Sequence, residues 1–457
     1  MMIRLSATLI LGLLVAHVAV GAPSRKVVPP AGGEDWGYID VRTGAHMFYW
    51  LYTSTAAPDP TTLPIILWLQ GGPGGSSTAY GNFEEMGPLD VNLQPRNSSW
   101  VHHANLVFID NPVGAGYSYA DNLADLATDT TQIAIDLVEF MRQFYVTYPE
   151  FLNTPVYCFS QSYGGKMAAF FGLEMDRAIK AGEIVSNFKG VALGSAWISP
   201  IDSTTSWAPY LLQTGIIDTR GHDFINNFAA GCRDLVNNGQ WTEATQCWSD
   251  TEIYVLIYGH NVDFYNILYR TPPIFLQEIL EIKDPRKRAY KLANRGSKAV
   301  EDLMNGPIYD KLSATLPYLN PWDAQGDAVF DANWDDFMKP AINAVERLLD
   351  ETELTVAVDN GQLDLICDTP SQVVWSEAMN WSQVGSWLSA SRNAFTVDGL
   401  TEGYNKRFGR FSFWWINRSG HSVPFDNPWG SIVMMRDVVG LPPQKNVEFN
   451  NEEAESK

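Results

Sequence analysis

The sequence predicts an α/β fold, in which a mostly parallel central sheet carries helices on both faces and an inserted, mainly helical cap interrupts the chain. Short runs of β-branched and aromatic residues alternate with longer segments of helical periodicity, which is the pattern of a parallel sheet. The short runs are apolar throughout, as in strands buried on both faces. From about residue 199 to 350 this alternation gives way to a polar, aromatic-rich and helix-leaning stretch, which we interpret as the cap.

Strands and helices alternate in the first part of the core, residues 22–198. Apolar residues at helical spacing, such as Ile133, Leu137 and Met141, favour the first helix, and the second ends before Gly182. The expected strands cover residues 46–54, 64–69, 105–110, 156–159 and 188–193, and the expected helices cover residues 129–145 and 166–180.

The second part of the core, residues 351–443, resumes the strand pattern after the cap. LTVAV (354–358) and FSFWWI (411–416) are expected strands, and a final helix is expected around residues 431–439. Residues 444–457 end in the acidic run NNEEAESK, so we expect a disordered tail there.

The composition is that of a globular protein with an excess of acidic residues. Of the 457 residues, 46% are hydrophobic and 18% are charged, which is enough apolar material for a large core. The formal net charge is -21 at pH 7. A surface this negative repels phosphate backbones and anionic lipids, which argues against nucleic-acid partners and membrane-surface roles.

Residues 1–21 have the organisation of a cleaved secretory signal peptide. Arg4 precedes an almost uninterrupted apolar run over residues 7–20, and Ala19-Val20-Gly21 is a small-x-small cleavage pattern. An uncleaved anchor is the alternative, but the run is shorter than the roughly 20 residues that a membrane span needs. We therefore expect a protein of the secretory pathway, extracellular or lysosomal, with no membrane span after signal cleavage.

Cysteines and glycosylation motifs fit this route. Cys232 and Cys247 lie close together in a polar stretch, and a disulfide between them is our first choice among three connectivities. Cys158 and Cys367 lie in apolar runs, where a buried free thiol and a bridge both remain open. The Asn-x-Ser motifs at Asn97, Asn380 and Asn417 are candidate N-glycosylation sites.

The segment VYCFSQSYGGK (156–166) has the pattern of a nucleophile elbow, a sharp turn between a strand and a helix, with Ser162 at its apex. The strained turn requires small residues two positions before and after the nucleophile. Here these are Ser160 and Gly164, in place of the usual two glycines. A plain strand-to-helix loop is the alternative, so the assignment depends on the partners that a catalytic serine needs.

Those partners are a histidine base and a carboxylate that orients it, and on α/β folds of this type they follow the serine in the order Asp, His. Of the seven histidines, only His421 lies beyond the cap in a loop after a late strand. Asp364 follows the strand 354–358 by a short turn, which places it at the carboxyl end of that strand. Asp359 and Asp368 are rivals, but Asp359 lies in the Asn-Gly turn and Asp368 fits the N-cap of the next helix.

Hydrolysis also needs backbone donors for the oxyanion of the reaction intermediate. The run QGGPGGSS (70–77) directly follows an expected central strand and offers closely spaced N–H groups. We assign the oxyanion hole to the N–H groups of Gly72 and Tyr163. A phosphate cradle is the alternative for a glycine run, but this run lacks the Lys of a P-loop and the spacing of a dinucleotide site.

In these segments the sequence resembles the serine carboxypeptidase family. The motifs that carry the resemblance run in order over nearly the whole mature chain: WLQGGPGGSS, NFEEMGPL, NLVFIDNPVGAGYSY, SQSYGGK, NGQLDLIC and SGHSVP. Gln70, Gly75 and GVALGSAWISP are most like the retinoid-inducible branch and its insect relatives. The resemblance implies an α/β-hydrolase fold with a cap, no cofactor, no metal, and a triad of Ser162, Asp364 and His421. It further implies removal of single C-terminal residues from peptides or proteins at acidic pH, and it leaves a homodimer possible.

The resemblance also implies a site for the free α-carboxylate of the substrate, at positions that here hold Gln70, Gly71, Glu85 and Gln161. The family has a Glu where this chain has Gln161, and two neighbouring carboxyls bind an anion only when protonated. Gln161 has the shape of a protonated acid and donates without titrating. We therefore expect substrate binding to weaken less steeply as the pH rises above the value of a free Glu, about 4.3. Asp359 is a second departure, because related chains often carry Tyr before the Asn-Gly.

These residues bear on four possible functions: a carboxypeptidase, an acyltransferase of the same fold, a lipase or esterase, and an inactive binding or stabilising protein. The intact triad disfavours the inactive protein, and the carboxylate-binding residues favour a peptidase over a lipase. The altered residue Gln161 is what favours an acyltransferase. The sequence therefore predicts a serine carboxypeptidase that acts through an acyl-enzyme, with the acyltransferase or a catalytically weak homologue as the alternative.

Overall fold

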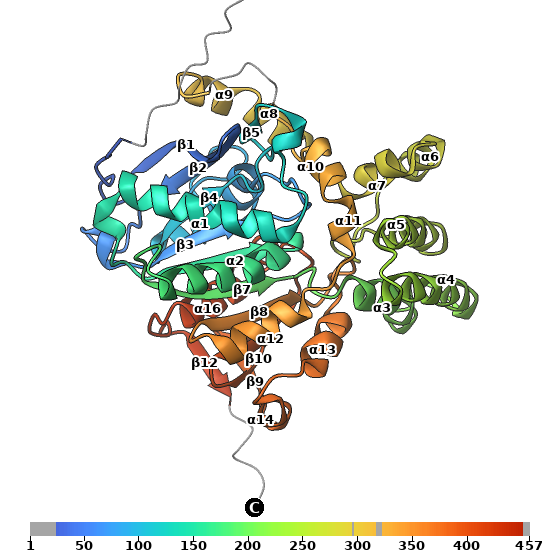
Figure 1. Cartoon of the computed structure of the whole chain (residues 1–457). Helices are drawn as coiled ribbons and strands as arrows, with labels where there is room; N and C mark the ends of the chain where they lie inside the picture. The colour runs from blue at the N-terminus through green and yellow to red at the C-terminus, as the bar shows by residue number, and fades with distance from the viewer. Residues whose placement is uncertain (1–23, 295–296, 317–321, 451–457) are drawn as a thin grey trace, which may run out of the picture.

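The structure is a computed structural model that describes residues 24–294, 297–316 and 322–450. Its strands are β1 (Glu34–Arg42), β2 (Ala45–Tyr52), β3 (Ile65–Leu69), β4 (Asn105–Ile109), β5 (Tyr119–Ala120), β6 (Val156–Gln161), β7 (Phe188–Gly194), β8 (Thr355–Gly361), β9 (Arg392–Val397), β10 (Leu400–Phe408), β11 (Phe411–Ile416) and β12 (Val447–Asn450). They form one sheet in the order β1-β2-β4-β3-β6-β7-β8-β11-β10-β9-β12, with β5 paired to β2 (Figure 1).

The central strands from β4 to β11 run parallel to their neighbours, and the strands at both edges run antiparallel. All residues of β3 and β6 are buried, because helices cover both faces of the sheet there. The sequence of β3 is apolar throughout, and that of β6 is apolar up to Phe159. The predicted α/β class is confirmed, and each strand predicted from an apolar run is present.

Strands β1, β9, β10 and β12, at and near the two ends of the sheet, and the short β5 were not predicted from the sequence. They lack the continuous apolar runs of the others: β1, β9 and β10 mix buried with partly exposed residues, and the described side chains of β12 are partly or fully exposed. The expected disordered tail from residue 444 is wrong for Val447–Asn450, which pairs with β9 as β12. Phe449 anchors this strand through ring contacts with Phe395 and Trp414. Residues 451–457 lie outside the described residues.

Two layers of helices bury the sheet (Figure 1). On one face lie α1 (Thr130–Thr147), α2 (Tyr163–Lys180) and α12 (Ile342–Glu351), and on the other lie the π-helical segment η2 (Ser77–Met86) and α16 (Pro428–Val438). Since α12 packs on α2 and β8, the chain returns to the sheet at Ile342, before the cap boundary expected at residue 350.

The inserted segment is helical, and Figure 1 shows its first helices beside the sheet rather than on either face. Its helices are α3 (Pro200–Gln213), α4 (Thr219–Asn237), α5 (Trp241–Tyr258), α6 (Pro273–Glu281), α7 (Pro285–Ala293), α8 (Lys298–Met304), α9 (Pro307–Leu312), α10 (Asp327–Ala332) and α11 (Trp334–Phe337). A disulfide joins Cys232 on α4 to Cys247 on α5, the pairing chosen first from the sequence. Cys158 and Cys367 are buried free thiols.

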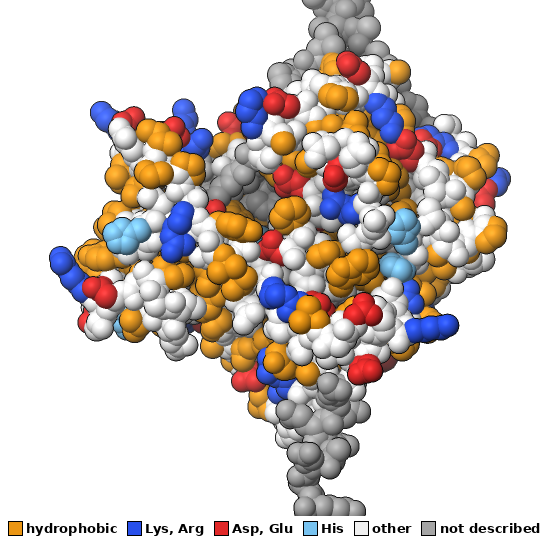
Figure 2. Space-filling view, turned by 180° about the vertical axis from the view of Figure 1, so that it is seen from behind, with side chains coloured by type: hydrophobic (Ala, Val, Ile, Leu, Met, Phe, Trp, Pro, Cys, Tyr) orange, Lys and Arg blue, Asp and Glu red, His pale blue; other side chains and the backbone are white. Residues whose placement is uncertain are grey.

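The surface shown in Figure 2 mixes acidic, basic and apolar side chains. Within the described ranges, no helix is both long and apolar enough to cross a membrane. The predicted signal peptide, residues 1–21, lies outside the described residues.

Candidate active site

Ser162 stands at the sharp junction between β6 and α2. Its φ of 61° and ψ of -128° are strained for a non-glycine residue and are the backbone signature of a nucleophile elbow. The N–H of Ser162 donates to Gly194 O at 2.9 Å, and its carbonyl accepts from Trp197 N at 2.8 Å. Strand β7 and the loop that follows it therefore hold the strained turn in place.

The residues two positions from Ser162 are small because backbone passes close to both. A Cβ atom on Gly164 would lie 2.3 Å from the carbonyl oxygen of Leu69, so only glycine fits there. Ser160 is tolerated in place of the other glycine, since its hydroxyl donates to Ala192 O at 2.8 Å in the buried sheet.

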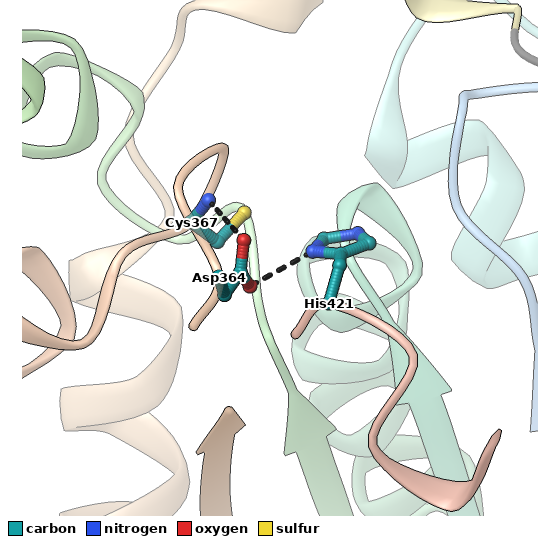
Figure 3. Close-up of side chains that lie close together, drawn as sticks. All are labelled: Asp364, Cys367 and His421. Carbon is teal, nitrogen blue, oxygen red and sulfur yellow. Dashed lines mark hydrogen bonds and ion pairs between the residues drawn. The ribbon is translucent and has the colours of Figure 1, made fainter. Parts of the chain in front are cut away.

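The predicted base and acid are paired next to this elbow. His421 Nδ1 lies 2.9 Å from Asp364 Oδ2, and the two side chains are 3% and 0% exposed. Figure 3 shows Asp364 between His421 and Cys367, whose backbone N–H donates to Asp364 Oδ1 at 3.1 Å. The main chain of His421 is held from the cap, because its N–H donates to Tyr265 O at 2.6 Å. A carboxylate on Nδ1 fixes the tautomer that leaves Nε2 free to accept a proton.

Ser162 and His421 line the same cavity. Their side chains are not joined by a hydrogen bond within the described part of the chain. Catalytic hydrogen bonds of this kind are often long in unliganded sites and shorten when substrate binds.

The two rival aspartates have other positions. Asp368 accepts from Ser371 N at 2.9 Å as the N-cap of α13 (Thr369–Ala378), as the sequence predicted, and also accepts from the Ser206 hydroxyl. Asp359 lies inside β8 and is 5% exposed. Among the described contacts, neither carboxyl is hydrogen-bonded to His421, which leaves Asp364 as its orienting partner.

The proposed oxyanion donors belong to the glycine loop and to the start of α2, and these two segments touch at the nucleophile. Tyr163 is the first residue of α2, and the first N–H groups of a helix have no intrahelical acceptor. A Cβ atom on Gly71 would lie 2.9 Å from Tyr163 N and 2.5 Å from Ser162 Cβ, so the glycine loop touches the elbow. Gly72 lines the cavity with a φ of +113°, a conformation open to glycine.

Three of the residues assigned to carboxylate binding form one buried cluster. Gln70 Nε2 donates to Gln161 Oε1 and, at 3.3 Å, to Glu85 Oε1. Gln161 Nε2 donates to Glu85 Oε2 at 3.1 Å. Trp68 Nε1 donates to Gln70 Oε1 at 2.8 Å, which orients the Gln70 amide toward the cluster. Gly71 follows Gln70 and lies on the wall of the cavity beside Ser162.

Burial raises the pKa of Glu85 to about 8, against the lowering effect of hydrogen bonds from Gln70 and Gln161. The carboxyl is 2% exposed, and a buried carboxyl is more stable in its neutral form. The expectation that binding weakens less steeply as the pH rises above the value of a free Glu, about 4.3, stays a prediction, and burial moves the titration of Glu85 above that value.

The cavity has a volume of about 290 Å³, and its wall includes residues that the sequence analysis did not select. Glu84, next to Glu85 on η2, faces the cavity, and burial raises its pKa to about 6. The motif NFEEMGPL offered both acids, but only the structure shows that Glu84 is the one that lines the cavity. Trp248 and Phe337 reach the cavity from the cap helices α5 and α11, and no sequence motif marks them.

Asp364, Cys367 and His421 lie close enough together to be considered as metal ligands. Burial raises the pKa of the Cys367 thiol well above its ordinary value. The hydrogen bond between Asp364 and His421 accounts for the cluster without an ion.

Comparisons with known proteins agree with this geometry. A family model described as serine carboxypeptidase matches residues 24–440. The retinoid-inducible serine carboxypeptidase of Mus musculus is 41% identical over 416 residues, which cover 89% of this chain and 91% of that protein. The venom serine carboxypeptidase of Apis mellifera is 28% identical over 412 residues, covering 85% and 80%.

A solved structure has the same fold. Kex1(delta)p, a prohormone-processing carboxypeptidase from Saccharomyces cerevisiae, aligns with a TM-score of 0.75 at 20% sequence identity, covering 91% of this chain and 94% of that one. The family model spans nearly all of the described chain, and the Mus musculus relative shares two residues in five with it. The chain therefore belongs to the serine carboxypeptidase family.

Proposed function

We propose that this serine carboxypeptidase cleaves the C-terminal peptide bond of peptides and proteins through an acyl-enzyme on Ser162. The observation that carries the proposal is the cavity in which three features meet. These are the strained Ser162, the His421–Asp364 pair, and Gln161, which directly precedes the serine. Gln161 is hydrogen-bonded to Gln70 and Glu85 in the buried cluster.

The catalytic steps follow from this geometry. His421 Nε2 accepts the proton of the Ser162 hydroxyl as Oγ attacks the carbonyl carbon of the scissile bond. The carbonyl oxygen becomes an oxyanion, which the N–H groups of Gly72 and Tyr163 stabilise. His421 then gives the proton to the leaving amine, and the C–N bond breaks. Water attacks the acyl-enzyme by the same route, and Ser162 is regenerated.

Gln70, Gly71, Glu85 and Gln161 hold the terminal carboxylate of the substrate. Gln161 directly precedes Ser162, so an anion held there lies close to the scissile bond and only one residue is released. With Glu85 protonated, the cluster presents hydrogen-bond donors and no net charge to the carboxylate. This is the feature that separates an exopeptidase from an esterase.

The direct test compares a blocked peptide that ends in a free carboxylate with the same peptide as its C-terminal amide. We expect kcat/KM for the amide to be lower by about 100-fold or more, because the hydrogen-bond donors of the cluster are then left without the carboxylate that accepts from them. Equal cleavage of the amide, or of a simple ester, would favour a lipase or esterase. Transfer of the acyl group to an added alcohol in preference to water would favour the acyltransferase.

The pH dependence of binding gives a second test, through Gln161→Glu. For the native enzyme the ionisation of Glu85, with a pKa of about 8, should raise KM above neutral pH, because the charged carboxyl repels the substrate carboxylate. In the variant a second acid titrates in the same cluster, so the rise should begin at lower pH. The kcat in acid should stay within a few fold. The measurement is KM against pH for both forms on one peptide.

Gln325→Glu is the matched control for this test. Gln325 also lines the cavity, but its amide donates to Pro73 O at 3.4 Å, away from the cluster. A carboxyl at position 325 also titrates, but it lies outside the cluster, so its effect on KM and on the pH dependence of KM should be much smaller than that of Gln161→Glu. Identical profiles for Gln161→Glu and the native enzyme would remove residue 161 from carboxylate binding.

We also propose export, with an extracellular or lysosomal destination. Peptide mapping of the mature protein should find an N-terminus near Ala22 and glycan on Asn97 or Asn380, which are both exposed. Asn417 should stay unmodified, since it is partly buried and its Nδ2 donates to Thr401 O at 3.3 Å. An N-terminus at Met1 without glycan would reject this route. The mass in solution of the same preparation tests for a homodimer.

A further inference from the structure

A buried acid lies beneath the active site without a hydrogen-bond partner for its carboxyl group in the described chain. Asp359 is 5% exposed, and only its backbone makes a hydrogen bond outside the strands, as the acceptor from Ser195 N at 2.7 Å. An unpartnered buried carboxyl is costly, so its position calls for an explanation.

The sheet places Asp359 beside the carboxylate-binding cluster. Gln161 on β6 is in register with Gly194 on β7, and Gly194 is in register with Asp359 on β8. Side chains in register on parallel strands point to the same face, and neighbouring strands are about 4.8 Å apart. Gly194 has no side chain, and a Cβ atom there would lie 3.2 Å and 3.3 Å from the two carboxyl oxygens of Asp359. The carboxyl therefore occupies the space over Gly194, toward Gln161.

A small void of about 10 Å³ connects the same groups. Asp359, Gly194, Gln161 and His421 line it together with apolar and small residues, namely Trp68, Trp100, Phe159, Ser160, Val423, Pro424 and Met434. Of the described residues that line this void, none is a Lys or Arg, so a negative charge on Asp359 is not neutralised there.

The titratable groups around Asp359 can be named element by element. His421, in the loop after β11, is the other titratable residue on the void, and Asp364 lies behind it. Glu85 on η2 stands on the far side of Gln161, and its own charged neighbours are Glu84 and Arg96. Gly194 on β7 and Gln161 on β6 do not titrate.

We propose that Asp359 is an additional determinant of substrate-carboxylate recognition, which must be protonated for the terminal carboxylate to bind tightly at the Gln70–Glu85–Gln161 cluster. The inference rests on the proposed function of that cluster. Burial raises the pKa of Asp359 to about 7. Below this pH the carboxyl of Asp359 is neutral. Above this pH it carries a buried negative charge, which repels the carboxylate of the substrate. With Gln161 in place of the family's Glu, the cluster has one titrating acid fewer. Asp359, two strands away in the sheet, supplies a titrating acid in its place.

The test measures peptide binding in the Ser162→Ala background, so that the peptide is not cleaved. Calorimetry at about pH 5 and about pH 7.5, on either side of the Asp359 titration, gives Kd for the free-acid peptide and for its amide. With Asp359 present, the free acid should bind about threefold more weakly at the higher pH, because an interaction of about one pKa unit is only partly developed about half a unit above a pKa of about 7. Adding Asp359→Asn should remove most of this weakening and leave Kd at the lower pH unchanged. The amide should show no such dependence.

Two further variants make the result specific. Asp359→Glu retains a titrating acid and should retain the pH dependence. Asp368→Asn alters another buried acid, whose pKa burial raises to about 8, but whose carboxyl faces Ser206 and α13. It should leave the pH dependence of Kd as it was. If Asp359→Asn does not fold, Asp359→Ser takes its place with the same expectation.

The outcomes separate the inference from the proposed function. An unchanged ratio of Kd values between the two pH values in Asp359→Asn would overturn the role of Asp359. Equal binding of the acid and the amide at the lower pH, with Asp359 intact, would instead show that the carboxylate site itself is wrongly assigned. A pH dependence that disappears in Asp368→Asn as well would assign it to buried charge in general and reject the specific role.

Discussion

Replacing Ser162 by Ala should abolish peptidase activity and leave the protein folded. The Cβ atom and the strained backbone are retained, and the hydroxyl takes no part in the hydrogen bonds of the described chain, so the substitution should cost little stability. Without Oγ no acyl-enzyme can form, and kcat/KM should fall by about 10⁴-fold or more. His421→Ala should behave in the same way, because the hydroxyl then lacks its base.

The measurement is the initial rate of C-terminal residue release, together with labelling by a fluorophosphonate that modifies activated serines. Label should map to Ser162 in the native enzyme and be absent from Ser162→Ala. Ser160→Gly is the matched control, since it alters a neighbouring buried serine to the residue usual at that position of the elbow. It should retain turnover and labelling. Near-normal turnover by purified Ser162→Ala would refute the triad.

Replacing Asp364 by Asn should lower kcat by about 10⁴-fold with little change in KM. An amide in place of the carboxylate can donate to His421 Nδ1, which holds the imidazole in the tautomer that has no acceptor for the serine proton. The hydrogen bond from Cys367 N to the side-chain oxygen can survive the change, so the loop should keep its shape.

Asp368→Asn is the internal comparison for this prediction. Asp368 is the neighbouring buried acid that the sequence offered as a rival, and it caps α13. Its loss should lower the melting temperature and leave kcat close to that of the native enzyme, because it does not contact His421. The measurement is kcat and thermal unfolding for both variants at one pH. The opposite pattern would make Asp368 the catalytic acid.

The sequence alone was sufficient for those parts of the protein that depend on local order along the chain. Continuous apolar runs predicted the central strands because such strands must be apolar on both faces. The strand–turn–helix pattern around Ser162 and the order of Ser162, Asp364 and His421 predicted a candidate triad, whose Ser162 and His421 line one cavity and whose His421 is hydrogen-bonded to Asp364. Strands β9 and β10 could not be found in this way because they mix buried with exposed residues and therefore have no continuous apolar run.

The tertiary structure decided the electrostatics. The sequence indicated that Glu85 belongs to the carboxylate site, but only the packing of Gln70, Gln161 and the surrounding sheet excludes water and raises the pKa of Glu85 to about 8. Asp359 is an ordinary turn residue in the sequence. Its place beside Gln161 follows from the register of three strands that are far apart in the chain. Burial and strand register are non-local, and the energy of a charge depends on everything that surrounds it, so the protonation states of this site could not be derived from the order of its residues.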